Sequence, residues 1–306
     1  MGLDNASIKF CCSAVTQGLD FSRTLMIGRQ WMYCDQDSLA QVFAKREIDS
    51  CPAQFIRDNK YGDAFFSLLG AKEVQSLDYS DYEGASIIHD MNAPVPESLK
   101  EKFSIVYDGG SLEHVFNIPQ ALKNCMEMIK VGGHFMQVNN ANNLMGHGFW
   151  QFSPELMFRV FSEENGFKVK VLLLHELAAG GDWYVVSDPE EVRQRVELRN
   201  DLPTLILTAA ERVSQVPVFT TTPQQSDYSD IWKTHEEQSD ESSDTDSSAP
   251  LVSPNKGGLK RFVPTSLKQS LRPLHRKLKA LKAPHPFDKP YFRKLSEENL
   301  LQGKIE

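Results

Sequence analysis

The chain has 306 residues, of which 41% are hydrophobic, and a formal net charge of −8. This length provides one large core and some additional chain, but hardly two full domains. No apolar run reaches the ~18 residues of a membrane-spanning helix, and we expect no secretory signal at the N-terminus. The five cysteines have no metal-like spacing, which predicts reduced thiols and a cytoplasmic location.

Strand-like and helix-like segments alternate over the first 210 residues. Short apolar, β-branched runs predict strands at 24–27, 74–78, 86–90, 103–108, 134–138, 168–174, 183–186 and 204–210. Apolar residues at helical spacing predict helices over 36–47, 53–69, 118–130 and 154–164. This alternation predicts an α/β fold with a doubly wound, mostly parallel sheet. The last three strands are separated by less helix, which predicts an antiparallel C-terminal edge.

The charge is distributed unevenly and indicates three parts. Residues 1–220 carry a net charge of −10, which disfavours nucleic acid as a partner of the main domain. We therefore predict a domain over 1–215, an acidic disordered linker over 216–255 and a basic helical segment over 256–306. The basic segment, with leucines at intervals of four and three, could contact a protein partner, an anionic membrane surface or the acidic body of its own chain.

Polar residues and glycines follow the expected strands at their carboxyl ends, where a doubly wound sheet places its ligand. In chain order they are Gly28-Arg29-Gln30, Asp78, Asp90-Met91, Asp108-Gly109, Leu112-Glu113-His114 and Gly146-His147-Gly148. The sequence therefore predicts a binding cleft along this edge.

Two motifs in this region carry a resemblance to a known family. LEHV follows the fourth expected strand, and IKVGGHF leads into the fifth. In their order and spacing these motifs resemble the S-adenosylmethionine (SAM)-dependent methyltransferases with the Rossmann-like, class I fold. The resemblance covers about residues 20–210. It implies SAM as the cofactor and transfer of its methyl group to an acceptor.

The resemblance also implies cofactor-binding residues. The acid that ends the second strand binds the ribose hydroxyls in this family, and Asp78 occupies that position. The acid after the third strand lies beside the adenine, which matches Asp90 with Met91 as its apolar neighbour. Asp108 and Gly109, at the same edge, complete the predicted set. In an alternative interpretation, Asp78 and Asp90 only cap turns.

The first loop departs from the family pattern, which is rich in glycine. It contains Gly28 alone, and a helical insertion at about 35–69 separates it from the second strand. Arg29 could hold the carboxylate of the methionine moiety, with Gln30 adding hydrogen bonds. Alternatively the loop no longer binds SAM, and the chain is a non-catalytic, methyltransferase-like module that binds a partner. A nicotinamide-dependent oxidoreductase is disfavoured, because G-x-G-x-x-G is absent.

Three residues near the strand ends are candidates for proton removal from the acceptor. They are His114, His147 and Glu113. The histidines suit this role because the pKa of a histidine lies near neutrality. In the alternative, His114 and Glu113 start a helix and His147 serves a tight turn. We predict no metal site, because the histidines and cysteines lack zinc-like spacing. The acceptor is predicted to be a small molecule or a glycan-type compound.

Overall fold

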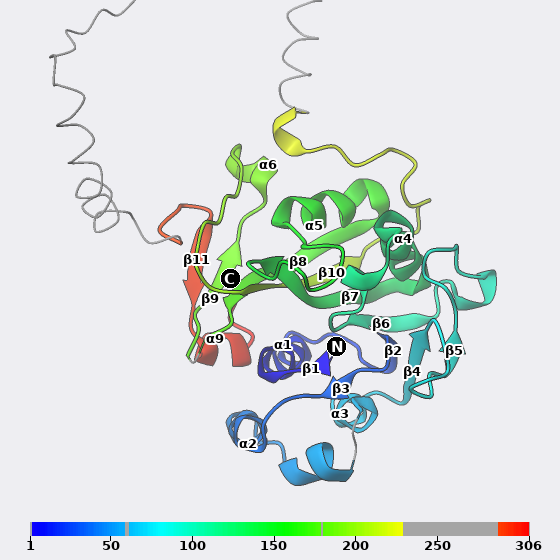
Figure 1. Ribbon diagram of the computed structural model, residues 1–306, viewed down its shortest axis with the longest axis vertical. Coiled ribbons are helices and arrows are strands. Elements are labelled where there is room, and N and C mark those ends of the chain that lie inside the picture. The colour runs from blue at the N-terminus through cyan, green and yellow to red at the C-terminus, as the bar shows by residue number, and fades with distance from the viewer. Residues whose placement is uncertain (1, 59–60, 179, 229–286, 306) are drawn as a thin grey trace, which may run out of the picture.

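A computed structural model describes residues 2–58, 61–178, 180–228 and 287–305 (Figure 1). Every helix within these ranges is too short or too polar to span a lipid bilayer. A nine-stranded sheet runs through the centre of the molecule in the order β11-β9-β8-β10-β7-β6-β2-β4-β5.

Five parallel strands form one half of the sheet: β2 (Arg23–Ile27), β4 (Glu73–Asp78), β5 (Ile87–Ile88), β6 (Phe103–Asp108) and β7 (Ile129–Asn142). Counted along the chain, they take the order 3-2-1-4-5 of a doubly wound fold. Antiparallel pairs join β7 to the other half, which consists of β10 (Thr204–Arg212), β8 (Phe167–Glu176), β9 (Trp183–Val186) and β11 (Phe292–Leu295). The predicted doubly wound sheet with an antiparallel edge is confirmed.

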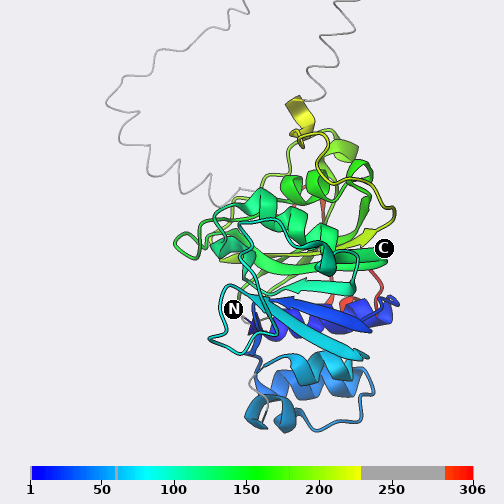
Figure 2. The ribbon, with the colours of Figure 1, turned by 90° about the vertical axis from the view of Figure 1, so that its right-hand side faces the viewer.

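Helices cover both faces of the sheet (Figure 2). Successive residues of the central strands enter different cores: Leu25 and Ile27 join one apolar cluster, and Met26 between them joins the other. This alternation is expected of a strand that is buried on both faces. The first cluster packs beneath α4 (Ile118–Met128) and α5 (Pro154–Val160), and the second beneath α1 (Asn5–Thr16), α2 (Gln36–Lys45) and α3 (Asp63–Leu68).

Short elements complete the domain. They are β1 (Gly2–Leu3), β3 (Trp31–Met32), the π-helix Gln54–Asp58, the 3₁₀ turns Glu97–Leu99, Leu112–His114 and Glu163–Asn165, and α6 (Pro189–Val192). The sequence predicts one helix over 53–69, whereas the structure contains the π-helix and α3 there.

The C-terminal residues 287–305 are part of the domain rather than a separate helical segment. Strand β11 pairs with β9, and Leu295 lies opposite Trp183. Helix α9 (Glu297–Leu301) packs against α1, and Lys9 Nζ lies 2.7 Å from Glu297 Oε2. The predicted boundary of the basic segment therefore differs from the structure, because its apolar end residues complete the sheet and the second core.

The first residues of the predicted acidic linker, 216–228, belong to the domain. Val218 is buried, and the backbone N–H of Ser226 donates to Glu155 Oε1 over 2.8 Å. Residues 216–228 thus pack on the domain. The rest of the predicted linker and the leucine-rich basic pattern lie in 229–286, outside the described residues.

Candidate functional site

The carboxyl ends of β2 and β4 and the loop that follows β6 are joined to one another at one edge of the sheet. The N–H of Gly28 donates to the carbonyl of Leu77 over 2.7 Å, and the Ser111 hydroxyl donates to the carbonyl of Ile27. The predicted cofactor-binding loops are therefore neighbours in space.

Gly28 and Gly109 lie where a side chain has no room. Gly28 has φ +70°, and a Cβ there would lie 2.5 Å from Ser111 Oγ. A Cβ at Gly109 would lie 2.4 Å from Gln30 Oε1. Gln30 is fully buried; its Nε2 donates to the Ile27 carbonyl over 2.6 Å, and its Oε1 has no hydrogen-bond partner in the described part of the chain. The side chain of Gln30 thus fills the space between the two glycines.

Arg29 points toward the helical insertion and the loop after β4. Its Nη1 donates to the carbonyl of Glu83 over 3.0 Å, and its Nε lies 3.4 Å from Asp63 Oδ2. Its guanidinium carbon lies 4.2 Å from the ring centre of Tyr61. Binding the carboxylate of a methionine moiety would require Arg29 to exchange these contacts.

Asp78 is the last residue of β4, and Asp90 lies in the loop after β5. Asp78 is half-buried, and its Oδ1 accepts from the N–H of Tyr79 over 2.6 Å. Asp90 is exposed, and the backbone N–H of Asn92 is the main cause that lowers the pKa of its carboxyl. Both carboxylates make the turn contacts of the alternative interpretation, and their ribose and adenine roles stay predictions. Met91 is buried in the first core, beneath the edge.

Asp108 lies below the loop that it precedes and is fully buried. Its Oδ1 accepts from the N–H of Ser111 over 2.8 Å, and its Oδ2 accepts from Asn139 Nδ2 over 2.9 Å. Burial, and then the negative charge of Glu113, raise the pKa of this carboxyl to about 8. Asp108 therefore shapes the loop, and a cofactor could touch it only after displacing these contacts.

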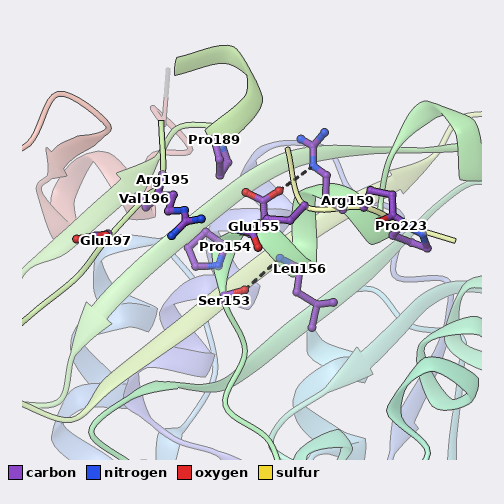
Figure 3. A pocket seen from close by; sticks show the side chains of 12 residues that line it. Ser153, Pro154, Glu155, Leu156, Arg159, Pro189, Arg195, Val196, Glu197 and Pro223 are labelled. Carbon is purple, nitrogen blue, oxygen red and sulfur yellow. Dashed lines mark hydrogen bonds and ion pairs between the residues drawn. The ribbon is translucent and has the colours of Figure 1, made fainter. Parts of the chain in front are cut away.

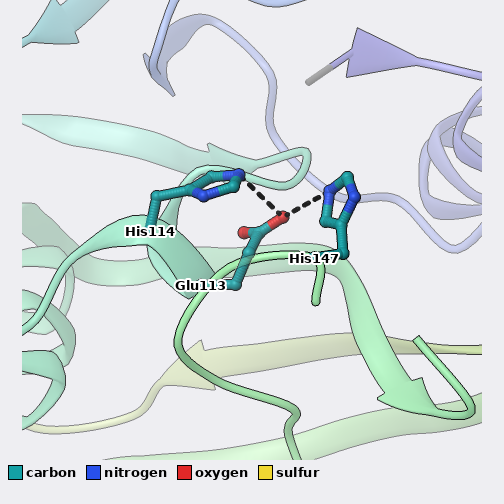
Figure 4. A group of neighbouring side chains, drawn as sticks. All are labelled: Glu113, His114 and His147. Carbon is teal, nitrogen blue, oxygen red and sulfur yellow. Dashed lines mark ion pairs between the residues drawn. The ribbon is translucent and has the colours of Figure 1, made fainter. Parts of the chain in front are cut away.

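The three residues predicted for the acceptor side lie together (Figure 4). Glu113 Oε1 is 3.7 Å from His114 Nε2 and 3.6 Å from His147 Nε2. Glu113 is 1% exposed, whereas both imidazoles are exposed. The sequence predicts no metal site, yet these three side chains form a group whose ligand atoms lie within 4.8 Å of one another. Spacing rules missed the group, because the fold brings His147 to Glu113 from a distant loop.

Backbone contacts hold the His147 loop against Glu113. The carbonyl of Glu113 accepts from the N–H of Phe149 over 2.7 Å, and Asn140 Nδ2 donates to the carbonyl of His147 over 2.9 Å. Gly146 (φ +92°) and Gly148 (φ +83°) provide the left-handed turns on either side of His147. The position of His147 is therefore set by the backbone.

Replacing Gly148 with alanine is expected to lower the free energy of unfolding by about 1–3 kcal/mol, because its Cβ would lie 2.7 Å from Glu113 Cγ. Gly146→Ala is the matched control: its φ is also positive, but nothing lies within 4 Å of a Cβ there. Urea denaturation measures both variants. Equal losses would show that Gly148 does not pack tightly on Glu113.

Exposed aromatic side chains border the cluster. The rings of Phe116 and Phe149 meet edge to face at 5.8 Å, and their residues are 72% and 67% exposed. Trp150 Nε1 donates to the carbonyl of Val115 over 2.9 Å. Phe152, by contrast, is a core residue. The apolar surface beside the cluster is therefore formed by the two loops that carry the histidines.

Two cavities are lined by residues outside the predicted site. One, of about 410 Å³, is bordered by α5 and residues near α6, including Glu155, Arg159 and Arg195 (Figure 3). The other, of about 550 Å³, is lined by residues that include Lys100, Glu127 and Arg212. None of the predicted site residues lines either cavity.

No protein-family model and no curated protein matches the sequence. Solved structures that resemble the chain include a proposed methyltransferase of Bacillus halodurans (14% identity, 66% of this chain and 99% of that chain, TM-score 0.37). A SAM-dependent methyltransferase of Thermotoga maritima has 14% identity over 69% of this chain and 90% of that chain, with a TM-score of 0.35. The branched-chain polyamine synthase of Thermus thermophilus has 16% identity over 68% and 56% of the two chains, with a TM-score of 0.33. These values are too low to support a function, which must be argued from the residues of this chain.

Proposed function

We propose that this protein is a SAM-dependent methyltransferase. One observation carries the proposal: a parallel sheet in the order 3-2-1-4-5 brings the loops of Gly28, Asp78 and Asp108 to one edge. A doubly wound sheet binds its ligand at this edge. Asp78 is proposed to accept hydrogen bonds from the ribose hydroxyls. Asp90, on the next loop, is proposed to lie beside the adenine.

The acceptor is proposed to bind beside Glu113, His114 and His147. Methyl transfer from a sulfonium is an in-line displacement, so the acceptor must be aligned and, where it carries a proton, deprotonated. Both imidazoles are exposed, and the exposed rings of Phe116 and Phe149 offer apolar contact beside them. A small-molecule or glycan-type acceptor with an ionisable group fits this surface.

Titration calorimetry of the full chain with SAM and S-adenosylhomocysteine tests the proposal. We expect micromolar binding, about −8 kcal/mol. Asp78→Ala should weaken binding by about tenfold to a hundredfold, because hydrogen bonds to a charged group contribute about 1.5–3 kcal/mol. Asp37→Ala, which removes an exposed carboxylate on α2, is the control and should bind as the unmodified chain does. Equal affinity of both variants would refute the role of Asp78.

The contacts of Arg29 and Gln30 favour a second candidate function. Both side chains of the divergent first loop are engaged within the protein, as expected of a methyltransferase-like module that binds a partner without catalysis. A folded chain that binds neither SAM nor S-adenosylhomocysteine would make this alternative the leading account.

A further inference from the structure

Glu113, His114 and His147 combine the side chains that bind transition metals in proteins. Two imidazole nitrogens face one carboxylate oxygen, at 3.7 and 3.6 Å (Figure 4). In a tetrahedral site, metal–ligand bonds of about 2.0–2.2 Å separate neighbouring ligand atoms by roughly 3.3–3.6 Å. The two separations from Glu113 are therefore close to those of a bound ion. The ligand atoms of all three side chains lie within 4.8 Å of one another, so the exposed imidazoles need to move by about 1 Å or less to reach one ion.

The carboxylate of Glu113 is buried without adequate compensation. Glu113 is 1% exposed, and its Oε2 has no hydrogen-bond partner among the residues that the structure describes. Burying a carboxylate with an unpartnered oxygen is costly unless a cation offsets its charge.

The backbone holds these ligands in place before any ion binds. His114 follows Glu113 in the 3₁₀ turn Leu112–His114, and the hydrogen bond from Phe149 N–H to the Glu113 carbonyl fixes the loop of His147. Asn140 Nδ2 donates to the His147 carbonyl and restrains the same loop. Preorganised ligands bind a metal more tightly than ligands that must be ordered first.

We infer that Glu113, His114 and His147 hold one divalent transition-metal ion, such as Zn²⁺. Imidazole ligands suit zinc, iron, cobalt and nickel, whereas Mg²⁺ and Ca²⁺ prefer oxygen ligands. Three protein ligands leave further coordination positions open, and the exposed sides of both imidazoles face solvent. Water, or on the proposed function an oxygen atom of the acceptor, can take these positions.

This site changes the role predicted for the two histidines. A ring nitrogen whose lone pair binds a metal cannot accept a proton, so each Nε2 acts as a ligand instead of a general base. The ion would then supply the Lewis-acid chemistry that acidifies a bound hydroxyl group. Metal binding itself does not depend on SAM, and the two can be measured separately.

The test is a titration of the full chain with Zn²⁺ after treatment with a chelator, in the absence of SAM. We expect one ion per chain, and visible absorption bands when Co²⁺ replaces Zn²⁺. His147→Ala and Glu113→Gln should each weaken binding at least about tenfold, since even the loss of a group behind the ligands costs 10–100-fold. His147 is exposed, so His147→Ala is expected to fold.

His89→Ala is the matched control, because His89 lies outside the cluster and its Nε2 is 3.1 Å from the Ala93 carbonyl. It should retain both the stoichiometry and the Co²⁺ bands. The inference is overturned if the unmodified chain binds no Zn²⁺, or if His147→Ala binds it as tightly as the His89 control. A SAM titration of the metal-free chain then reports separately on the proposed methyltransferase function.

Discussion

Replacing Leu300 with alanine is expected to lower the free energy of unfolding by about 2–5 kcal/mol. Leu300 lies on α9 and is fully buried in the cluster that includes Phe10 and Cys11 of α1. Removal of its side chain leaves a cavity between two segments from opposite ends of the chain. Urea denaturation, followed by circular dichroism, measures the loss.

Leu202→Ala is the matched control for this change. Leu202 is 39% exposed, so its truncation should alter the free energy of unfolding by no more than about 0.5 kcal/mol. If both variants lose the same small free energy of unfolding, α9 does not contribute to the core. Residues 287–305 would then not pack on the domain as described.

The second large effect concerns pH. Asp108 has its pKa raised to about 8 by burial and by Glu113, whereas an unfolded aspartate titrates near 3.9. Between about pH 4 and 8 the folded protein therefore retains a proton that the unfolded chain has released. Stability is greatest below this range and falls as the pH rises through it, by at most about 1.4 kcal/mol for each pH unit.

Asp108→Asn removes this titration. As the pH is raised from 5 to 8, the unmodified protein should therefore lose free energy of unfolding relative to the variant. Asp90→Asn is the control: its carboxyl is exposed and its pKa is lowered, so it titrates below this range in both states. Denaturation curves at several pH values measure the differences. Parallel pH profiles for Asp108→Asn and the unmodified chain would contradict the prediction.

The sequence predicts the central sheet well because its strands are buried on both faces. Runs such as 103–108 and 204–210 are mostly apolar, and their positions agree with β6 and β10. Strand β11 was missed because it lies at an edge: Phe292 and Leu295 are buried, but Arg293 and Lys294 between them are exposed. Four residues with that pattern do not distinguish a strand from a loop.

The sequence predicts which residues form the candidate site, but it does not predict how they are arranged. The position of Asp78 at a strand end follows from the local pattern. The partners of Arg29, by contrast, come from a helix and a loop that sequence spacing does not relate to it. The approach of His147 to Glu113 likewise depends on a tertiary contact, the hydrogen bond from Phe149 to the Glu113 carbonyl. Local patterns carry no information about such contacts.

The pairing of α1 with α9 has a consequence for biosynthesis. The ion pair of Lys9 with Glu297 joins residues 288 positions apart, which is a contact of very high sequence separation and favours slow folding. A ribosome adds about 5–20 residues per second. The apolar face of α1 is therefore synthesised well before α9, the helix that covers it. Until residues 292–301 have been synthesised, the edge of β9 and this face of α1 remain open to other chains. We therefore expect nascent chains of this protein to need protection from aggregation until residues 292–301 have been translated.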